Sequence, residues 1–83
     1  MPISVKVLYF GLTRDASGSA EEQFSLPDRA SLQTLLDSAK KRHGKLAKIA
    51  KSVQVALNEE IATGDERLRD GDVVALIPPV AGG

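Results

Sequence analysis

The sequence predicts an α+β domain in which a mixed sheet of about five strands carries one main helix on one face. Three observations predict this. With 83 residues, the chain has room for one core, so residues 1–83 form a single domain. Two strand-like segments precede one long amphipathic segment, and further strand-like segments follow it. One helix cannot cross between distant strands twice, which excludes a doubly wound sheet.

The segment before the helix predicts two strands. Residues 3–10 alternate, with one apolar set on one face and Leu8 and Phe10 on the other. Residues 11–19 contain two glycines, an aspartate and two serines, which predicts a loop. Residues 22–26 predict a weaker strand with Phe24 and Leu26 facing inward, and Pro27 ends it.

The helix signals begin at Ser31, a good N-cap residue, with Asp28 as an alternative. Apolar residues recur at i, i+3, i+4 and i+7 from Leu32 to Ala39, which predicts one apolar stripe on a helix of about twelve residues. Cationic residues fill the last turn, and Gly44 is placed to be the C′ residue. A further helical turn could follow at residues 46–49.

Three short segments complete the sheet. Residues 53–57 alternate, residues 58–60 predict a turn, and residues 61–62 predict a short return strand. An Asp-Gly turn at residues 70–71 precedes the last strand, Val73–Ile77, which is apolar throughout. A right-handed crossover through the helix then gives a β-grasp arrangement, with the first and last strands parallel and adjacent at the centre.

Composition excludes several classes of function. Zero net charge argues against non-specific binding of nucleic acid, and three aromatic residues without Trp argue against stacking on single strands. The absence of Cys excludes disulfides, iron–sulfur clusters and cysteine nucleophiles, and it fits a cytoplasmic protein. We expect no signal peptide and no membrane partner, because no apolar run approaches the ~20 residues that span a bilayer.

Few polar residues suggest chemistry. His43, the only histidine, is expected to be a capping or solvated residue at the helix end. The acidic stretch at residues 65–72 lacks the ligand spacing of a calcium loop, so we expect no metal site. A basic stretch runs from Lys40 to Lys51; a solvated helix face is the simpler interpretation, and a steering patch for an acidic partner is the alternative.

The tail, residues 78–83, is the most informative segment. Pro78-Pro79 favours an extended polyproline form, directly after an apolar strand. Gly82-Gly83 has no side chains and could enter a channel too narrow for other residues. A frayed terminus is the alternative interpretation. We predict that the flexible tail is functional and that the α-carboxyl of Gly83 is its working group.

Three segments together resemble the small subunit of molybdopterin synthase, a family of ubiquitin-like sulfur carriers: residues 5–11, residues 55–58, and residues 68–83 with their Asp-Gly-Asp turn and Pro-Pro-Val-Ala-Gly-Gly ending. The resemblance implies that an E1-like adenylating enzyme uses ATP and Mg²⁺ to adenylate Gly83. Sulfur from a sulfurtransferase donor then replaces AMP and leaves a thiocarboxylate.

The same resemblance implies that a large catalytic subunit, in a heterotetramer, receives the tail and builds the dithiolene of molybdopterin. The residues implied to insert with it are Pro78, Pro79, Val80, Ala81 and Gly82. The chain would then be a non-catalytic subunit of a sulfurtransferase, with a transient acyl-adenylate and no stably bound cofactor.

Partner binding also needs a surface. Strand alternation predicts an outward apolar patch close to where the tail departs, made of Leu8, Phe10, Ala75 and Ile77. The alternative is that a loop covers this patch. Other functions also stay open: a sulfur carrier for thiazole (thiamine) or cysteine synthesis, a ubiquitin-like protein modifier, or a β-grasp interaction domain with an idle tail.

Overall fold

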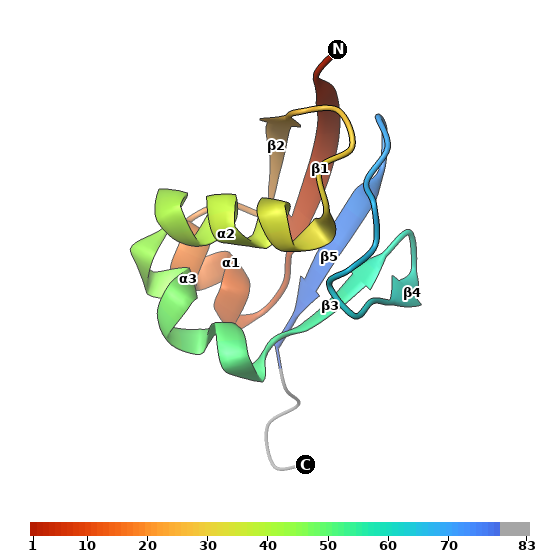
Figure 1. Ribbon diagram of the computed structural model, residues 1–83. Coiled ribbons are helices and arrows are strands. Elements are labelled where there is room, and N and C mark those ends of the chain that lie inside the picture. The colour runs from red at the N-terminus through yellow and green to blue at the C-terminus, as the bar shows by residue number, and fades with distance from the viewer. Residues whose placement is uncertain (79–83) are drawn as a thin grey trace.

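The computed structural model describes residues 1–78, and its centre is a five-stranded sheet with strand order β2-β1-β5-β3-β4 (Figure 1). The strands are β1 (Ile3–Tyr9), β2 (Glu21–Leu26), β3 (Gln54–Leu57), β4 (Glu60–Ile61) and β5 (Val73–Ile77). The β1–β5 pair is parallel, and all the other pairs are antiparallel. The β-grasp fold and the central pairing of the first and last strands are therefore confirmed.

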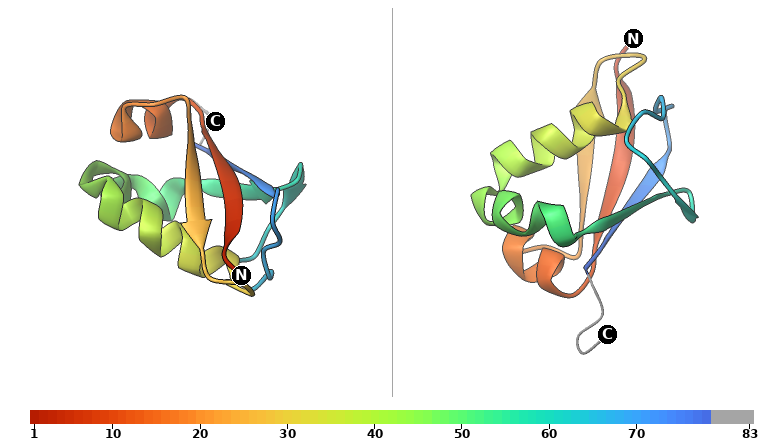
Figure 2. Two further views of the ribbon diagram at one scale, coloured as in Figure 1. Left: turned by 90° about the horizontal axis from the view of Figure 1, so that it is seen from above. Right: turned by 60° about the horizontal axis from the view of Figure 1, so that its bottom comes forward.

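The main helix, α2 (Leu32–Arg42), lies across one face of the sheet (Figures 1 and 2). It begins where the sequence predicts, because the Ser31 Oγ accepts a hydrogen bond from the Thr34 N–H at 3.2 Å. Helix α3 (Gly44–Ile49) and the 3₁₀ turn η1 (Ala50–Ser52) follow and lead the chain back to the sheet at β3. No helix in the part of the chain that the structure describes is long and apolar enough to cross a bilayer.

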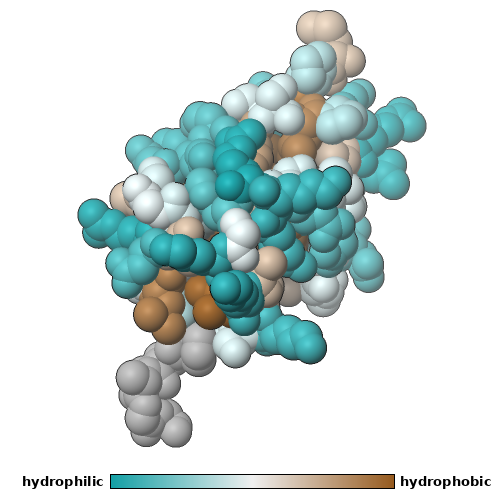
Figure 3. Space-filling model, turned by 90° about the vertical axis from the view of Figure 1, so that its left-hand side faces the viewer, coloured by the Kyte–Doolittle hydropathy of each residue, from teal (hydrophilic) through white to brown (hydrophobic). Residues whose placement is uncertain are grey.

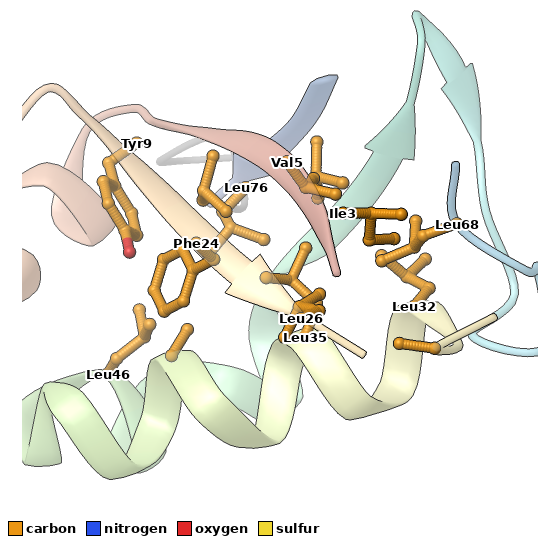
Figure 4. Close-up of a cluster of buried hydrophobic side chains, with 14 residues drawn as sticks. Ile3, Val5, Tyr9, Phe24, Leu26, Leu32, Leu35, Leu46, Leu68 and Leu76 are labelled. Carbon is orange, nitrogen blue, oxygen red and sulfur yellow. The ribbon is translucent and has the colours of Figure 1, made fainter. Parts of the chain in front are cut away.

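The core lies between the sheet and α2, where the inward side chains of β1, β2 and β5 meet the apolar stripe of the helix (Figure 4). Leu32 and Leu35 of the helix are completely buried, as are Val5 of β1 and Val74 of β5. Burial of each such side chain contributes about 1.5–3 kcal/mol, so this one layer supplies most of the stability of a small domain.

Residues 11–19 form a helix for most of their length, so the predicted loop is wrong there. Helix α1 (Leu12–Ser17) ends at Gly18, whose φ of 75° is left-handed and whose N–H donates to the Arg14 carbonyl at 2.9 Å. Helix α1 packs beside α3 at one end of the molecule (Figures 1 and 2). Its single buried residue is Thr13, so no apolar stripe marks it in the sequence.

The end of α2 also differs from the prediction. His43, not Gly44, is the last capping position, with an extended backbone at φ −128° and ψ 94°, and its N–H donates to the Ala39 carbonyl at 2.9 Å. Gly44 instead begins α3. The polypeptide therefore bends at His43 and starts a new helix, so the glycine does not act as a left-handed stop.

The acidic segment between β4 and β5 is held by its own carboxylates. Glu66 accepts hydrogen bonds from the backbone N–H groups of Thr63 and Gly64, each at 2.8 Å. These bonds hold the pKa of Glu66 below its ordinary value. Asp70 accepts from the Ser4 N–H at 2.7 Å, and Asp72 accepts from the Arg69 N–H at 2.8 Å. These carboxylates organise turns before the central strand.

Candidate partner interface at the end of strand β5

The outward face of the two central strands is apolar near the end of β5. Leu8 of β1 lies opposite Ala75 of β5 in the parallel register, and both are half-buried. Phe10, just after β1, is 49% exposed, and Ile77, the last residue of β5, is 36% exposed. These four side chains lie on the outward face of the sheet, and the two farthest along the strands are the most accessible. Their role as a partner interface stays a prediction.

A fifth apolar side chain, Leu12, follows Phe10 closely in the sequence. It is the first residue of α1 and is 58% exposed, two residues beyond Phe10. We call these five residues, Leu8, Phe10, Leu12, Ala75 and Ile77, the exit patch. Figure 3 shows this end of the molecule, where a small hydrophobic area is bordered by hydrophilic side chains. Exposed apolar side chains gathered in this way are typical of protein interfaces.

Thr13 fastens the turn between β1 and α1 to the end of β5. Its side chain is completely buried although it carries a hydroxyl. The Thr13 hydroxyl accepts from the Phe10 N–H at 2.8 Å. Its one hydrogen is within donating distance of two carbonyl oxygens, that of Phe10 at 2.7 Å and that of Leu76 at 3.2 Å. The position of Leu76, two residues before Pro78, is thus set by the same hydroxyl that shapes the turn.

Pro78 is the last described residue, and it is half-buried against Gly11. Gly11 has a φ of 52°, and a Cβ at this position would lie 2.9 Å from the Pro78 Cγ. The glycine therefore lets the proline ring approach the backbone closely. The other predicted tail residues, Pro79, Val80, Ala81, Gly82 and Gly83, lie outside the described residues.

A polar cluster joins β1, β2 and the end of α2 on the helix side. The Oε1 atom of Glu22 accepts hydrogen bonds from the Tyr9 hydroxyl at 2.8 Å and from His43 Nε2 at 2.9 Å. Arg42 Nη1 lies 3.4 Å from the Glu22 Oε2 atom, and the Arg42 guanidinium also stacks over the Phe24 ring at 4.2 Å. Of the two expectations for His43, the capping residue is confirmed by its place at the end of α2, and the solvated side chain is wrong, because only 17% of that side chain is exposed.

The pKa values of this cluster follow from its contacts. Burial raises the pKa of the Tyr9 phenol well above 10, and the hydrogen bond to Glu22 adds to that rise. Burial opposes ionisation of Glu22 as well. Hydrogen bonds from His43 and Tyr9 outweigh that effect and lower the pKa of the Glu22 carboxyl. The ionised Glu22 carboxylate therefore connects β1, β2 and the end of α2.

A groove of about 360 Å³ lies on the opposite side of the sheet from the exit patch. It runs between α2 and the β3–β4 edge, and its lining includes Leu36, Val55 and Leu76. Leu76 points toward the helices, whereas its neighbours Ala75 and Ile77 point the other way. The groove and the exit patch therefore lie on opposite faces of the sheet. Within residues 1–78, no three His, Asp or Glu side chains are grouped in a way that could hold a metal ion.

The sequence matches a known family over almost its whole length. A family model described as the ThiS family matches residues 7–83. The molybdopterin synthase sulfur carrier subunit of Chlamydomonas reinhardtii is 39% identical over 83 residues, covering 98% of this chain and 100% of the relative.

Solved structures share the fold over nearly the whole chain. A putative molybdopterin converting factor subunit 1 from Pyrococcus furiosus has a TM-score of 0.87 and 37% identity, covering 94% of this chain and 99% of that one. SAMP1 from Haloferax volcanii has a TM-score of 0.88 and 26% identity, with coverages of 96% and 99%. A complex of subunits 1 and 2 of the molybdopterin-converting factor from Helicobacter pylori contains a chain with a TM-score of 0.68 and 29% identity, with coverages of 98% and 100%.

The strand order and the solved structures define a ubiquitin-like β-grasp protein, and the exposed apolar side chains of the exit patch lie at the end of its last strand. Within that class, the chain belongs to the ThiS family of sulfur carriers.

Proposed function

We propose that this chain is the sulfur carrier subunit of a molybdopterin synthase and that it carries sulfur on the C-terminal carboxyl of Gly83. The observation that supports this most strongly is the family match, which extends through the Gly82–Gly83 pair. The similarity to molybdopterin synthase sulfur carrier subunits supports molybdopterin synthesis over thiazole or cysteine synthesis.

The proposed cycle begins with activation, because a carboxylate is a poor electrophile. The Gly83 carboxylate attacks the α-phosphate of ATP, with Mg²⁺, on an adenylating enzyme; an acyl-adenylate forms and pyrophosphate leaves. A sulfur nucleophile at the oxidation level of hydrosulfide, supplied by a donor protein, then attacks the carbonyl carbon. The C–S bond forms as the C–O bond to phosphate breaks, AMP leaves with the electron pair, and a thiocarboxylate remains.

The role of the chain in the next step is delivery. The thiocarboxylate is a nucleophile at neutral pH and needs no base from this chain, and the described part of the chain holds no group of catalytic side chains near the end of β5. Residues 78–83 would place the sulfur in the active site of a large catalytic subunit, where proximity supplies the gain in rate. The complex of subunits 1 and 2 in the Helicobacter pylori structure supports such a partner.

The exit patch is the proposed contact surface for that large subunit. Its apolar side chains surround the place where the described chain ends, so docking there would aim the tail into the partner. The fold also leaves the other end of the domain, with β4 and the acidic segment, away from that contact (Figure 1). ATP-dependent activation and the absence of cysteine favour the cytoplasm as the compartment.

A direct test is a reconstituted synthesis of molybdopterin with the large subunit, an adenylating enzyme, ATP and a sulfur donor. A variant with one alanine added after Gly83 should give no product, because the glycine carboxyl is then an amide. The matched control adds one alanine before Met1 and should retain full activity. Product formation by the C-terminally extended variant would contradict the proposal.

Modification of other proteins is the second candidate function, and the likeness to SAMP1 of Haloferax volcanii, a small archaeal modifier protein, favours it. A modifier would form an isopeptide bond between Gly83 and a lysine of a target. Digestion of cell extract with trypsin would then yield lysines that carry a remnant of this tail. Finding such remnants would support the modifier role, and finding only free chain with sulfur on Gly83 would support the carrier role.

A further inference from the structure

Four exposed lysines on the helices form a surface that the proposed function has not used. Residues 40–51 contain six Lys and Arg side chains and no Asp or Glu. Lys40 pairs with Asp37 at 4.0 Å, and Arg42 pairs with Glu22 at 3.4 Å. The other four, Lys41, Lys45, Lys48 and Lys51, are exposed and make no ion pair within the described chain. We call these four residues the basic ridge.

The fold does not need the basic ridge. Lys45 and Lys48 lie three residues apart in α3, so their positive charges repel each other on the same side of a short helix. None of the four side chains makes a hydrogen bond within residues 1–78. The acidic segment is different, because its carboxylates hold turns before β5 through bonds to backbone N–H groups. The carboxylates of the acidic segment therefore have a structural role, whereas the four lysines of the basic ridge have none within the described chain.

Zero net charge conceals a separation of charge across the molecule. The basic ridge lies on the end of α2, on α3 and on η1, whereas residues 59–72 carry six Asp or Glu and two Arg side chains around β4 and the following loop. Figure 1 shows α3 at the left of the molecule and the edge strand β4 at the right. An approaching charged protein would therefore experience a strongly oriented field even though the chain is neutral overall.

The basic ridge and the exit patch are connected through neighbouring elements at the same end of the molecule. Helix α3 packs beside α1, whose first residue, Leu12, belongs to the exit patch. On the other side, Lys51 precedes Gln54 by three residues, and Gln54 pairs with Ile77 in the sheet. Figure 3 shows hydrophilic side chains around a hydrophobic area on this face of the molecule.

We propose that the basic ridge docks an acidic protein surface beside the cleft that receives the tail of this chain. The inference rests on the proposed function and specifies the chemistry of the partner: carboxylates should line the rim of its cleft, next to the apolar contact with the exit patch. Opposite charges at the rim of an interface mainly raise the association rate and fix the orientation of the encounter.

A protein surface fits the basic ridge better than a nucleic acid does. A polyanion longer than the ridge would meet the carboxylates of residues 59–72, and the neutral chain would release few counterions. Residues 40–53 also contain no Phe, Tyr or Trp on which a base could stack. A folded partner with a limited acidic area can contact the ridge and leave the acidic end in solvent.

The test is the association rate with the large subunit of the same organism, measured by stopped-flow fluorescence. The ridge variant carries Lys45→Glu and Lys48→Glu. Its matched control carries Arg67→Glu and Arg69→Glu, two exposed side chains without ion pairs in the described chain, which change the net charge equally within the acidic segment. Circular dichroism would verify that both variants fold.

At ~10 mM ionic strength, where the screening length is about 30 Å, the ridge variant should associate about tenfold more slowly than the wild type. The control should change less than about threefold, and near 150 mM salt, where the screening length is about 8 Å, the ridge effect should shrink. Dissociation rates should change little.

An equal loss of rate in both variants would show a net-charge effect and overturn the inference, as would an unchanged rate in the ridge variant. Binding of single-stranded RNA by the wild type that only the ridge variant loses, with unchanged association to the large subunit, would also overturn it. A wild-type chain that does not bind the large subunit at all would instead reject the proposed function, and the inference with it.

Discussion

Glu22 is the residue whose carboxylate joins two strands to the end of the main helix. It accepts hydrogen bonds from Tyr9 of β1 and from His43 after α2, and it lies on the edge strand β2. A charged acceptor shared by two donors is worth more than a neutral one, because each bond is charge-assisted. The cluster therefore fixes the position of the edge strand relative to the helix.

Replacing Glu22→Gln should lower the free energy of unfolding by about 1–3 kcal/mol at pH 7, because one amide oxygen replaces a carboxylate that serves two donors. The matched control is Glu21→Gln, whose carboxylate is 58% exposed and lies 3.5 Å from the Lys6 amine. That change should cost less than about 1 kcal/mol. Urea denaturation of both variants checks the difference, and equal losses would contradict the role of Glu22.

The pH dependence of stability should have a definite sign. The folded pKa of Glu22 is lowered, so its contribution is present above the ordinary value of 4.5 and is lost as the pH falls below it. The difference in the free energy of unfolding between the wild type and Glu22→Gln should therefore shrink as the pH falls below about 5. The opposite sign holds for Tyr9 at alkaline pH. The pKa of its phenol is raised in the folded chain, so the stability linked to this shift is present below pH 10 and is lost as the pH rises above 10. A gap that stays constant from pH 7 into acid would contradict this assignment.

Among the elements, the turn between β1 and α1 matters most for the candidate interface. It places Phe10 and Leu12 beside the end of β5, and Thr13 connects it to the Leu76 carbonyl. The turn therefore couples the exit patch to the residue that precedes the tail.

Replacing Thr13→Val keeps the shape of the side chain but removes the hydroxyl, so the part-buried Phe10 N–H loses its acceptor at 2.8 Å and keeps only the Leu76 carbonyl at 3.4 Å. The variant should lose about 1–3 kcal/mol of stability, and amide hydrogen exchange should accelerate chiefly in α1 and at the end of β5. The control, Thr34→Val, changes an exposed threonine on α2 and should leave exchange in α1 unchanged. Uniform acceleration in both variants would contradict a local role for Thr13.

The elements that sequence patterns predicted well are those with a clear periodicity. Alternation placed Val5, Phe24 and Leu76 in the core, and the i, i+3, i+4 stripe with its Ser31 cap placed α2. Helix α1 was missed because it is six residues long and buries only a threonine. Its one usable signal was Gly18, a left-handed C-terminal glycine that lies four residues after Arg14, whose carbonyl it caps.

The sequence predicted four of the five residues of the exit patch and missed the fifth. Leu8, Phe10, Ala75 and Ile77 follow from strand alternation alone, because neighbouring side chains in a strand point to opposite faces. Leu12 could not be placed without α1. The partner of His43 also lay beyond local patterns, because Glu22 is 21 residues away and reaches it only through the pairing of β1 with β2.

For the molecule as a whole, the exit patch should carry binding energy that another exposed apolar residue does not. Phe10→Asp should weaken affinity for the large subunit by about tenfold or more, because it would bury a charge in an apolar contact. The matched control is Ile61→Asp on β4, which is 63% exposed at the far edge of the sheet. Calorimetric titration of both folded variants decides this, and equal affinities would contradict the exit patch as the interface.

The central claim is that Gly83 is loaded with sulfur, and intact mass spectrometry of the chain isolated from its own organism tests it most directly. The account predicts a population heavier than the unmodified chain by the difference between one sulfur and one oxygen atom. Fragmentation should place that difference on Gly83, and treatment with an alkylating reagent should add one group there. A chain that is always unmodified in cells actively making molybdopterin, or sulfur located on any other residue, would contradict the account.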